Sequence, residues 1–302
     1  MRTPAIAILT AASLLASVAA CNRTDTDEHA EHAAESTTDS GATSLQPSDS
    51  MLPAGATDVA ARLAASPRHA EWAMIATGEG SGDSTRAYVV YPERADKAPV
   101  VLVIHEIFGL TPWIRGVADQ LAKEGYIAIA PDLLTRYNIP GSPLDPVADS
   151  ATAAIRSLSQ DDANKQLDAV ARWGMALPAA MDSYGVVGFC WGGGMSFAHA
   201  VHAPGLDAAV VYYGTSPESS ALATVHAPVL GLYAGDDARV NSTVAAADSA
   251  MKAGGHTYSI HTYEGAGHGF LRQQDGRDGA NMAATQGAWP ETLAWFRQYL
   301  GN

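Results

Sequence analysis

The 302-residue sequence predicts an α/β fold in which a mostly parallel central sheet carries helices on both faces. Two observations predict it. Short runs rich in Val, Ile, Ala and Tyr recur from residue 85 onward, and longer amphipathic segments lie between them. Strands that are apolar on both sides and alternate with helices are typical of a parallel sheet covered on both faces.

The element order follows from these runs. We expect a half-exposed first strand at 85–92, and buried strands at 98–106, 126–133, 184–190, 206–214, 227–235 and 257–265. Helices are expected at about 112–124, 160–176, 192–202, 240–254 and 289–300. Residues 135–158 contain Pro, Gly and Asp and interrupt the alternation, so we expect a long connection there that could carry a small cap over a site.

The first 50 residues do not have the composition of a folded core. Residues 1–20 combine Arg2, an apolar stretch and small residues before Cys21, which is the pattern of a secretory signal peptide. The junction VAAC also resembles a bacterial lipobox, in which the cysteine is acylated; the alternative is an ordinary signal peptide that leaves Cys21 free. Residues 21–50 are mostly small, polar or acidic and predict a disordered tether. Residues 51–302 are predicted to form one domain.

This pattern predicts an exported protein, anchored by a lipid on Cys21 in the bacterial cell envelope and facing the periplasm. Asn22 stands where lipoproteins of the inner membrane usually have an aspartate, which favours the outer membrane in a host with two membranes. We expect the folded part to be a monomer.

The charge distribution restricts the possible partners. The formal net charge is −14, to which residues 1–20 contribute +1 and residues 21–50 contribute −6, so −9 remains on 51–302. A domain this acidic is not expected to bind nucleic acid, and an anionic ligand would need locally placed arginines. The sequence has no zinc-ligand or phosphate-loop pattern, so we expect neither a metal nor a cofactor.

Cys190 lies between a predicted strand and a predicted helix, within the segment GFCWG. This is the nucleophile-elbow pattern with cysteine in place of serine. We expect the turn to hold the thiol at the amino end of the helix, where the helix dipole and a nearby imidazolium lower its pKa. The backbone N–H of Trp191 would then face an oxyanion. The alternative is a structural turn with a buried, inert cysteine.

Two further predicted strands end in residues that complete a triad. Asp237 follows the strand at 227–235, and His268 follows a short glycine loop after the strand at 257–265. The chain order of cysteine, aspartate and histidine is that of α/β-hydrolase triads.

Residues from about 70 to 300 resemble the dienelactone hydrolase family of the α/β-hydrolase superfamily, whose members use a cysteine nucleophile. The segments that carry the resemblance are HEIFGL (105–110), PDLLTR (131–136), GFCWGG (188–193), GDDARV (235–240) and GHGFLR (267–272). The resemblance implies an α/β-hydrolase fold with Cys190 as nucleophile, Asp237 orienting His268, and His268 as general acid and base.

The resemblance also implies roles for residues around this triad. Glu106 matches a glutamate beside the thiol, and Ile107 matches the second oxyanion N–H. Arg136 and Arg272 match two arginines that bind the substrate carboxylate, and Tyr212 matches a pocket tyrosine. From the residues alone, Glu106 as a plain surface acid and the arginines as surface salt bridges remain open.

The predicted function is therefore hydrolysis of small esters or lactones that bear a carboxylate, of the carboxymethylenebutenolide type, through a thioester on Cys190. Two alternatives remain at this point. One is an esterase or peptidase of other specificity on the same fold. The other is a lipid-anchored binding protein or thiol redox sensor that has kept the fold without turnover.

Overall fold

An eight-stranded sheet runs through the computed structural model, which describes residues 51–78 and 83–301. Its strand order is β1-β2-β4-β3-β5-β6-β7-β8. The described residues belong to one unit, Ser44–Asn302. The predicted signal peptide, the tether and Cys21 lie outside the described residues.

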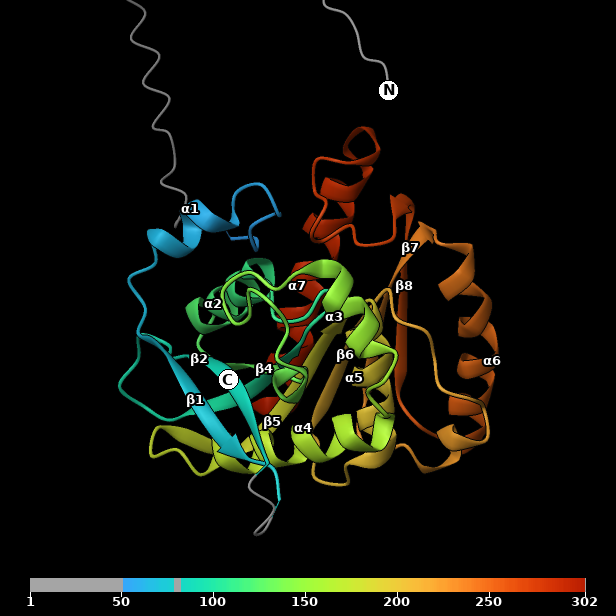
Figure 1. Cartoon of the computed structure of the whole chain (residues 1–302). Helices are drawn as coiled ribbons and strands as arrows, with labels where there is room; N and C mark the ends of the chain where they lie inside the picture. The colour runs from blue at the N-terminus through green and yellow to red at the C-terminus, as the bar shows by residue number, and fades with distance from the viewer. Residues whose placement is uncertain (1–50, 79–82, 302) are drawn as a thin grey trace, which may run out of the picture. The chain divides into compact units, whose positions relative to one another are not determined.

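The sheet is antiparallel at one edge and parallel elsewhere (Figure 1). β1 pairs with β2 and β2 with β4 in antiparallel register, whereas every pair from β4 to β8 is parallel. The strands are β1 (Ala70–Ala76), β2 (Ser84–Val90), β3 (Ala98–Ile104), β4 (Ile127–Asp132), β5 (Ala180–Phe189), β6 (Ala208–Tyr212), β7 (Val229–Asp236) and β8 (Tyr258–Gly267).

Helices connect the parallel strands, and several begin at residues that satisfy free backbone N–H groups. Thr111 caps α2, Ser159 caps α4 and Asp237 caps α6 through their side-chain oxygens. The helices are α1 (Val59–Ala64), α2 (Pro112–Lys123), α3 (Ala148–Ile155), α4 (Gln160–Met175), α5 (Trp191–His202), α6 (Ala238–Gly254) and α7 (Ala280–Leu300), with 3₁₀ turns η2 (Thr135–Tyr137), η3 (Ala221–Thr224) and η4 (Arg277–Gly279).

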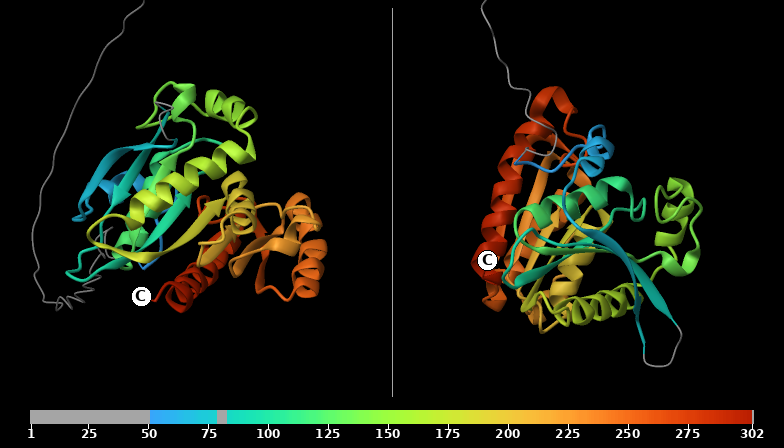
Figure 2. Two further views of the ribbon diagram at one scale, coloured as in Figure 1. Left: turned by 90° about the horizontal axis from the view of Figure 1, so that it is seen from below. Right: turned by 90° about the vertical axis from the view of Figure 1, so that its left-hand side faces the viewer.

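Alternate residues of the central strands face two separate cores. Val100, Leu102 and Ile104 of β3 pack with residues of α4, α5 and α6, whereas Val101 and Val103 pack with residues of α2 and α7. Figure 2 shows α7 along one side of the sheet and α3 and α4 on the other. The predicted α/β-hydrolase fold, with a mostly parallel sheet covered on both faces, is confirmed.

Several elements differ from the sequence prediction. β1 and α1 were not predicted; β1 is an edge strand with mixed exposure and no regular alternation, and α1 has only six residues, of which Val59 alone is buried. β8 was expected to be a buried strand, but it lies at the other edge of the sheet and most of its residues are exposed or partly exposed. α7 begins at Ala280 and not near 289, with Pro290 inside the helix. The connection at 135–158 contains η2 and the short helix α3.

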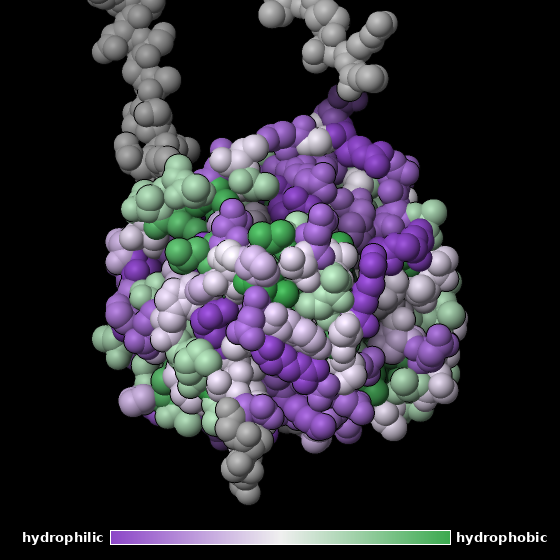
Figure 3. Space-filling model, viewed as in Figure 1, coloured by the Kyte–Doolittle hydropathy of each residue, from purple (hydrophilic) through white to green (hydrophobic). Residues whose placement is uncertain are grey.

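Polar side chains cover most of the face shown in Figure 3, and the apolar residues on it lie in small patches. Within residues 51–78 and 83–301, no helix is both long enough and apolar enough to cross a bilayer. The same residues contain no cluster of three or more His, Cys, Asp or Glu side chains arranged to hold a metal ion.

Candidate active site

Cys190 occupies a strained turn between β5 and α5. Its backbone has φ 58° and ψ −116°, a conformation that costs free energy in any residue other than glycine. Two flanking glycines make the turn possible. A Cβ on Gly188 would lie 1.8 Å from the carbonyl oxygen of Gly192, and a Cβ on Gly192 would lie 2.4 Å from the carbonyl oxygen of His105. The predicted elbow is therefore present, built by close backbone contact between strand, turn and helix.

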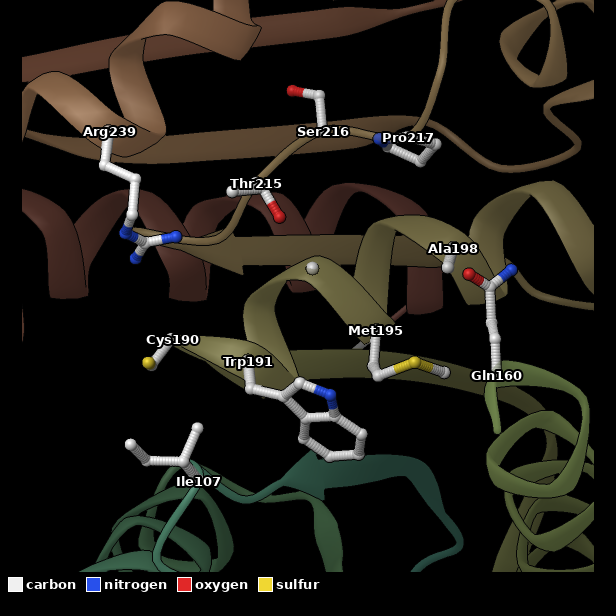
Figure 4. A pocket seen from close by; sticks show the side chains of 11 residues that line it. Ile107, Gln160, Cys190, Trp191, Met195, Ala198, Thr215, Ser216, Pro217 and Arg239 are labelled. Carbon is white, nitrogen blue, oxygen red and sulfur yellow. The ribbon is translucent and has the colours of Figure 1, made fainter. Parts of the chain in front are cut away.

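The turn places the half-buried Cys190 side chain in a cavity of about 490 Å³ (Figure 4). Ile107 and Trp191, the residues predicted to supply oxyanion N–H groups, line the same cavity. The remaining lining residues are Gln160, Gly194, Met195, Ala198, Thr215, Ser216, Pro217 and Arg239.

The surroundings of Cys190 keep its thiol protonated at rest. Burial raises the pKa of Cys190, and the carboxylate of Glu106 raises it further. The backbone N–H of Trp191 and the guanidinium of Arg239 lower it, but by less. The sequence-based expectation of a lowered pKa is thus wrong, because burial and a like charge outweigh the start of the helix. The thiol must lose its proton to a neighbouring base before it can attack.

Asp237 and His268 meet at the carboxyl ends of β7 and β8. The Nδ1 atom of His268 is 2.6 Å from Oδ2 of Asp237, whose side chain is only 7% exposed. The other carboxylate oxygen of Asp237 accepts a long hydrogen bond of 3.4 Å from the backbone N–H of Val240, at the start of α6. These contacts fix the carboxylate, and through it the tautomer and orientation of the imidazole.

Tyr213 connects this pair to the thiol. Its ring packs edge-on against His268 with centroids 5.1 Å apart, and its backbone φ is 39°. Burial raises the pKa of Tyr213 far above its usual value, and the charges of Glu106 and Cys190 contribute to that rise. Tyr213 is therefore close to the thiol, to Glu106 and to the imidazole at once.

Glu106 is buried directly after β3 and pairs with Arg272. Oε2 of Glu106 and Nε of Arg272 are 2.8 Å apart, but the N–H does not point at the oxygen, so the contact is an ion pair and not an aligned hydrogen bond. Burial raises the pKa of Glu106 to about 7, although the nearby Arg272 charge opposes the rise. Glu106 thus gains or loses a proton near neutral pH. It is not a plain surface acid.

Comparison with known proteins identifies the family of the chain. The model of the dienelactone hydrolase family matches residues 85–300, more than half of the chain. The chain belongs to the dienelactone hydrolase family. It is accordingly a hydrolase of the α/β-hydrolase fold.

Relatives of similar length share about a third of their residues with this dienelactone hydrolase family member. The "Putative carboxymethylenebutenolidase" of Salmonella typhi is 35% identical over 266 residues, which cover 83% of this chain and 97% of the relative. The protein of the same name from Escherichia coli K12 is 33% identical over 259 residues, with coverages of 82% and 94%. The crystal structure of a "Putative Dienelactone Hydrolase" from Klebsiella pneumoniae is similar, with a TM-score of 0.67 at 33% identity over 77% of this chain and 99% of the other.

Two residues carried over from the family pattern do not reach the cavity of Cys190. Arg136, exposed on η2, pairs with Asp162 at 3.1 Å and lines a separate pocket of about 440 Å³ that also includes Lys165. Tyr212 is fully buried, and its hydroxyl is 2.7 Å from that of Thr292. The prediction that Arg136 and Arg272 converge on one pocket is wrong, because Arg136 lines a separate pocket against α4, whereas Arg272 pairs with Glu106 beside the thiol.

Two residues at the site were missed by the sequence reasoning. Tyr213, directly after β6, packs its ring against His268, whereas the hydroxyl of the predicted Tyr212 meets Thr292 in the same apolar core. Arg239 lines the cavity of Cys190 from the first turn of α6. One signal in the sequence could have revealed Arg239: a cation in a first turn, where acidic residues are favoured.

Proposed function

We propose that this dienelactone hydrolase family member cleaves small esters or lactones by attack of Cys190 on the acyl carbon, with His268 and Asp237 as its proton-transfer partners. One observation carries the proposal. The half-buried thiol of Cys190 lies on a strained turn and faces a cavity. At the same edge of the sheet, Asp237 follows β7, His268 follows β8, and the carboxylate contacts the imidazole.

Activation of the thiol is the first step. Since the raised pKa of Cys190 keeps it protonated at rest, a base must remove the proton when substrate is present. Asp237 occupies Nδ1 of His268, which leaves Nε2 as the basic nitrogen of the imidazole. Glu106, with its pKa raised to about 7, is a second acceptor close to the thiol.

The reaction then proceeds in two halves. The Cys190 thiolate forms a bond to the carbonyl carbon, and the oxygen gains negative charge toward the N–H groups of Trp191 and Ile107. The C–O bond to the alcohol breaks, the alkoxide takes a proton from the His268 imidazolium, and a thioester remains. Water, deprotonated by His268, attacks the thioester, and the carboxylic acid and the free thiol are released.

The names of the relatives support a substrate class. Carboxymethylenebutenolidase names an enzyme for a butenolide, which is a lactone, with a carboxyl-bearing substituent. We therefore propose that this chain also acts on lactones or esters with a carboxylate near the scissile bond.

The test is to trap the acyl-enzyme. Incubation with p-nitrophenyl acetate should acetylate the peptide containing Cys190, as read by mass spectrometry, and alkylation of the thiol should abolish nitrophenol release. Cys190→Ala should lower turnover by at least about 10³-fold. Near-full esterase activity in Cys190→Ala would refute the proposal.

The same experiment separates the hydrolase from a thiol redox sensor. A sensor thiol reacts as the thiolate, which the raised pKa of Cys190 disfavours in the resting protein. A sensor would also be oxidised by peroxide without catalysing ester turnover. Steady nitrophenol release beyond one equivalent per Cys190 therefore identifies the hydrolase.

We also propose that the chain is exported and anchored through a lipid on Cys21. The largely apolar residues 1–20 and the VAAC junction support this proposal. Expression of the full chain in a bacterium with labelled palmitate should give a labelled, membrane-bound product. Cys21→Ala should lose both the label and the membrane association. Equal labelling in Cys21→Ala would refute the anchor and leave the hydrolase proposal unaffected.

A further inference from the structure

Among the described residues that line the cavity of Cys190, Arg239 is the one with a permanent charge. In Figure 4 its guanidinium reaches from α6 toward the end of the cavity that holds Cys190, beside Thr215. Gln160 and Ala198 lie at the opposite end. The cavity is therefore cationic near the thiol and uncharged away from it.

The guanidinium of Arg239 has no ion-pair or hydrogen-bond partner within the described part of the chain. The two carboxylates that precede it are both occupied, since Asp236 pairs with Arg277 and Asp237 with His268. Arg272 and Arg136, by contrast, are neutralised by Glu106 and Asp162. An exposed, unpaired arginine beside the thiol is free to bind an anion without first breaking an ion pair.

The place of Arg239 in its helix is electrostatically unfavourable. It is the second residue of α6, after the cap Asp237, where the helix dipole is positive and disfavours a cation. Side chains in a helix lean toward its amino end, which directs Arg239 over the start of α6 and into the cavity. The N–H groups of that first turn add to the positive potential that an anion would meet there.

We propose that Arg239 is the specificity-determining residue that binds the carboxylate of an anionic ester or lactone during attack by Cys190. The inference rests on the proposed function and places the carboxylate site at Arg239, because in this structure Arg272 is paired with Glu106 and Arg136 with Asp162. It deepens the substrate class as well. The carboxylate must lie on the acyl side, close to the scissile carbonyl, since the guanidinium and the thiol share one end of the cavity.

A pair of alkylating reagents tests this without requiring turnover. Iodoacetate and iodoacetamide both transfer a two-carbon group to the Cys190 sulfur with release of iodide, but only iodoacetate carries a carboxylate. The rate of each is measured by mass spectrometry on the Cys190 peptide of the full chain. The ratio of the two rates is independent of the thiol pKa, because both reagents react with the same thiolate.

Arg239→Gln should lower the iodoacetate-to-iodoacetamide ratio by about 10-fold, the effect of one charge-assisted contact. Arg239→Lys should retain part of the ratio, since the charge remains and the planar fork is lost. Arg277→Gln is the matched control, because it removes the same charge from a neighbouring arginine outside the cavity. Its ratio should stay within about twofold of the wild type.

Three outcomes would overturn the inference: an unchanged ratio in Arg239→Gln, an equal fall in Arg277→Gln, or a larger fall in Arg136→Gln. The second outcome would show that any positive charge nearby attracts the reagent without a local contact. The third would show that Arg136, the arginine implied by the family resemblance, binds the carboxylate. Because the readout is alkylation, these results are distinct from a failure of Cys190 to support ester hydrolysis. A matched pair of p-nitrophenyl esters, glutarate against valerate, should repeat the selectivity in kcat/KM for the active enzyme.

Discussion

The edge of the sheet where β3, β5, β7 and β8 end differs instructively from the flank where η2 meets α4. At the sheet edge, the structure brings together Cys190, Glu106 and the Asp237–His268 pair from segments far apart in the sequence. At the flank, Arg136 was expected to join them but pairs with Asp162 at a separate pocket. Both regions follow predicted strands, yet only the residues at the sheet edge come close together as predicted.

The difference lies in what determines each position. Residues directly after parallel strands are placed by the topology of the sheet, since the carboxyl ends of such strands meet at one edge. Arg136 lies four residues beyond the end of β4, in a 3₁₀ turn whose side chains follow local contacts. Position after a strand is thus predictable from sequence, whereas side-chain direction in a longer connection is not.

The largest expected effect tests whether backbone contact enforces the sheet-edge region. Gly192→Ala would place a Cβ 2.4 Å from the carbonyl oxygen of His105, so backbone must move. We expect the free energy of unfolding, measured by urea titration, to fall by more than about 3 kcal/mol. Gly205→Ala is the control, because no atom lies within 4 Å of a Cβ there. Equal stability of the two variants would show that the elbow can relax and is not rigidly fixed by backbone contact.

The second prediction uses the buried carboxyl at this edge. The folded pKa of Glu106 is raised from 4.5 to about 7, so between these values the unfolded chain has released a proton that the folded chain still holds. Titration of Glu106 therefore does not change the free energy of unfolding below pH 4.5. It lowers the free energy of unfolding as the pH rises from 4.5 to about 7, and the total loss above this range is on the order of 3 kcal/mol.

Glu106→Gln should lack this pH-dependent loss. We therefore expect the difference in free energy of unfolding between Glu106→Gln and the wild type to shift in favour of the variant when the pH is raised from 4.5 to above 7. Urea unfolding of both proteins at the two pH values measures this. Glu264→Gln, at an exposed glutamate, should follow the wild type at both values. Parallel curves for Glu106→Gln and the wild type would mean that Glu106 titrates normally.

A third prediction concerns the orientation of the imidazole. Asp237→Asn should lower kcat by about 10²-fold, equivalent to ~2.7 kcal/mol, because an amide can hold the wrong tautomer of His268. The loss should be smaller than that of Cys190→Ala. The variant Asp168→Asn, at the exposed pair with His202, is the matched control and should keep its activity. If both variants lose activity equally, the Asp237–His268 contact has no special role in turnover.

The sequence supported the fold and the triad positions for the same physical reason. The central strands β5 and β7 contain apolar, buried runs, and β8 carries several β-branched and aromatic residues; glycine or polar residues follow each, so the ends of all three could be located. β1 escaped notice because an antiparallel edge strand buries little. The start of α7 was placed too late because a proline such as Pro290 is usual in a first helical turn. The pKa of Cys190 could not be foreseen, because it depends on burial by segments distant in sequence.

The smallest expected effect separates two adjacent tyrosines at the end of β6, Tyr212 within the strand and Tyr213 directly after it. Tyr212 shares a hydrogen bond with Thr292, so Tyr212→Phe should lower the free energy of unfolding by about 1 kcal/mol and leave activity unchanged. The hydroxyl of Tyr213 is buried and has no hydrogen-bond partner among the residues that the structure describes, and Tyr213→Phe keeps the ring beside His268, so its stability should change by less than about 0.5 kcal/mol. Urea unfolding of both variants decides the order. A greater loss in Tyr213→Phe would show that its hydroxyl is hydrogen-bonded in the protein.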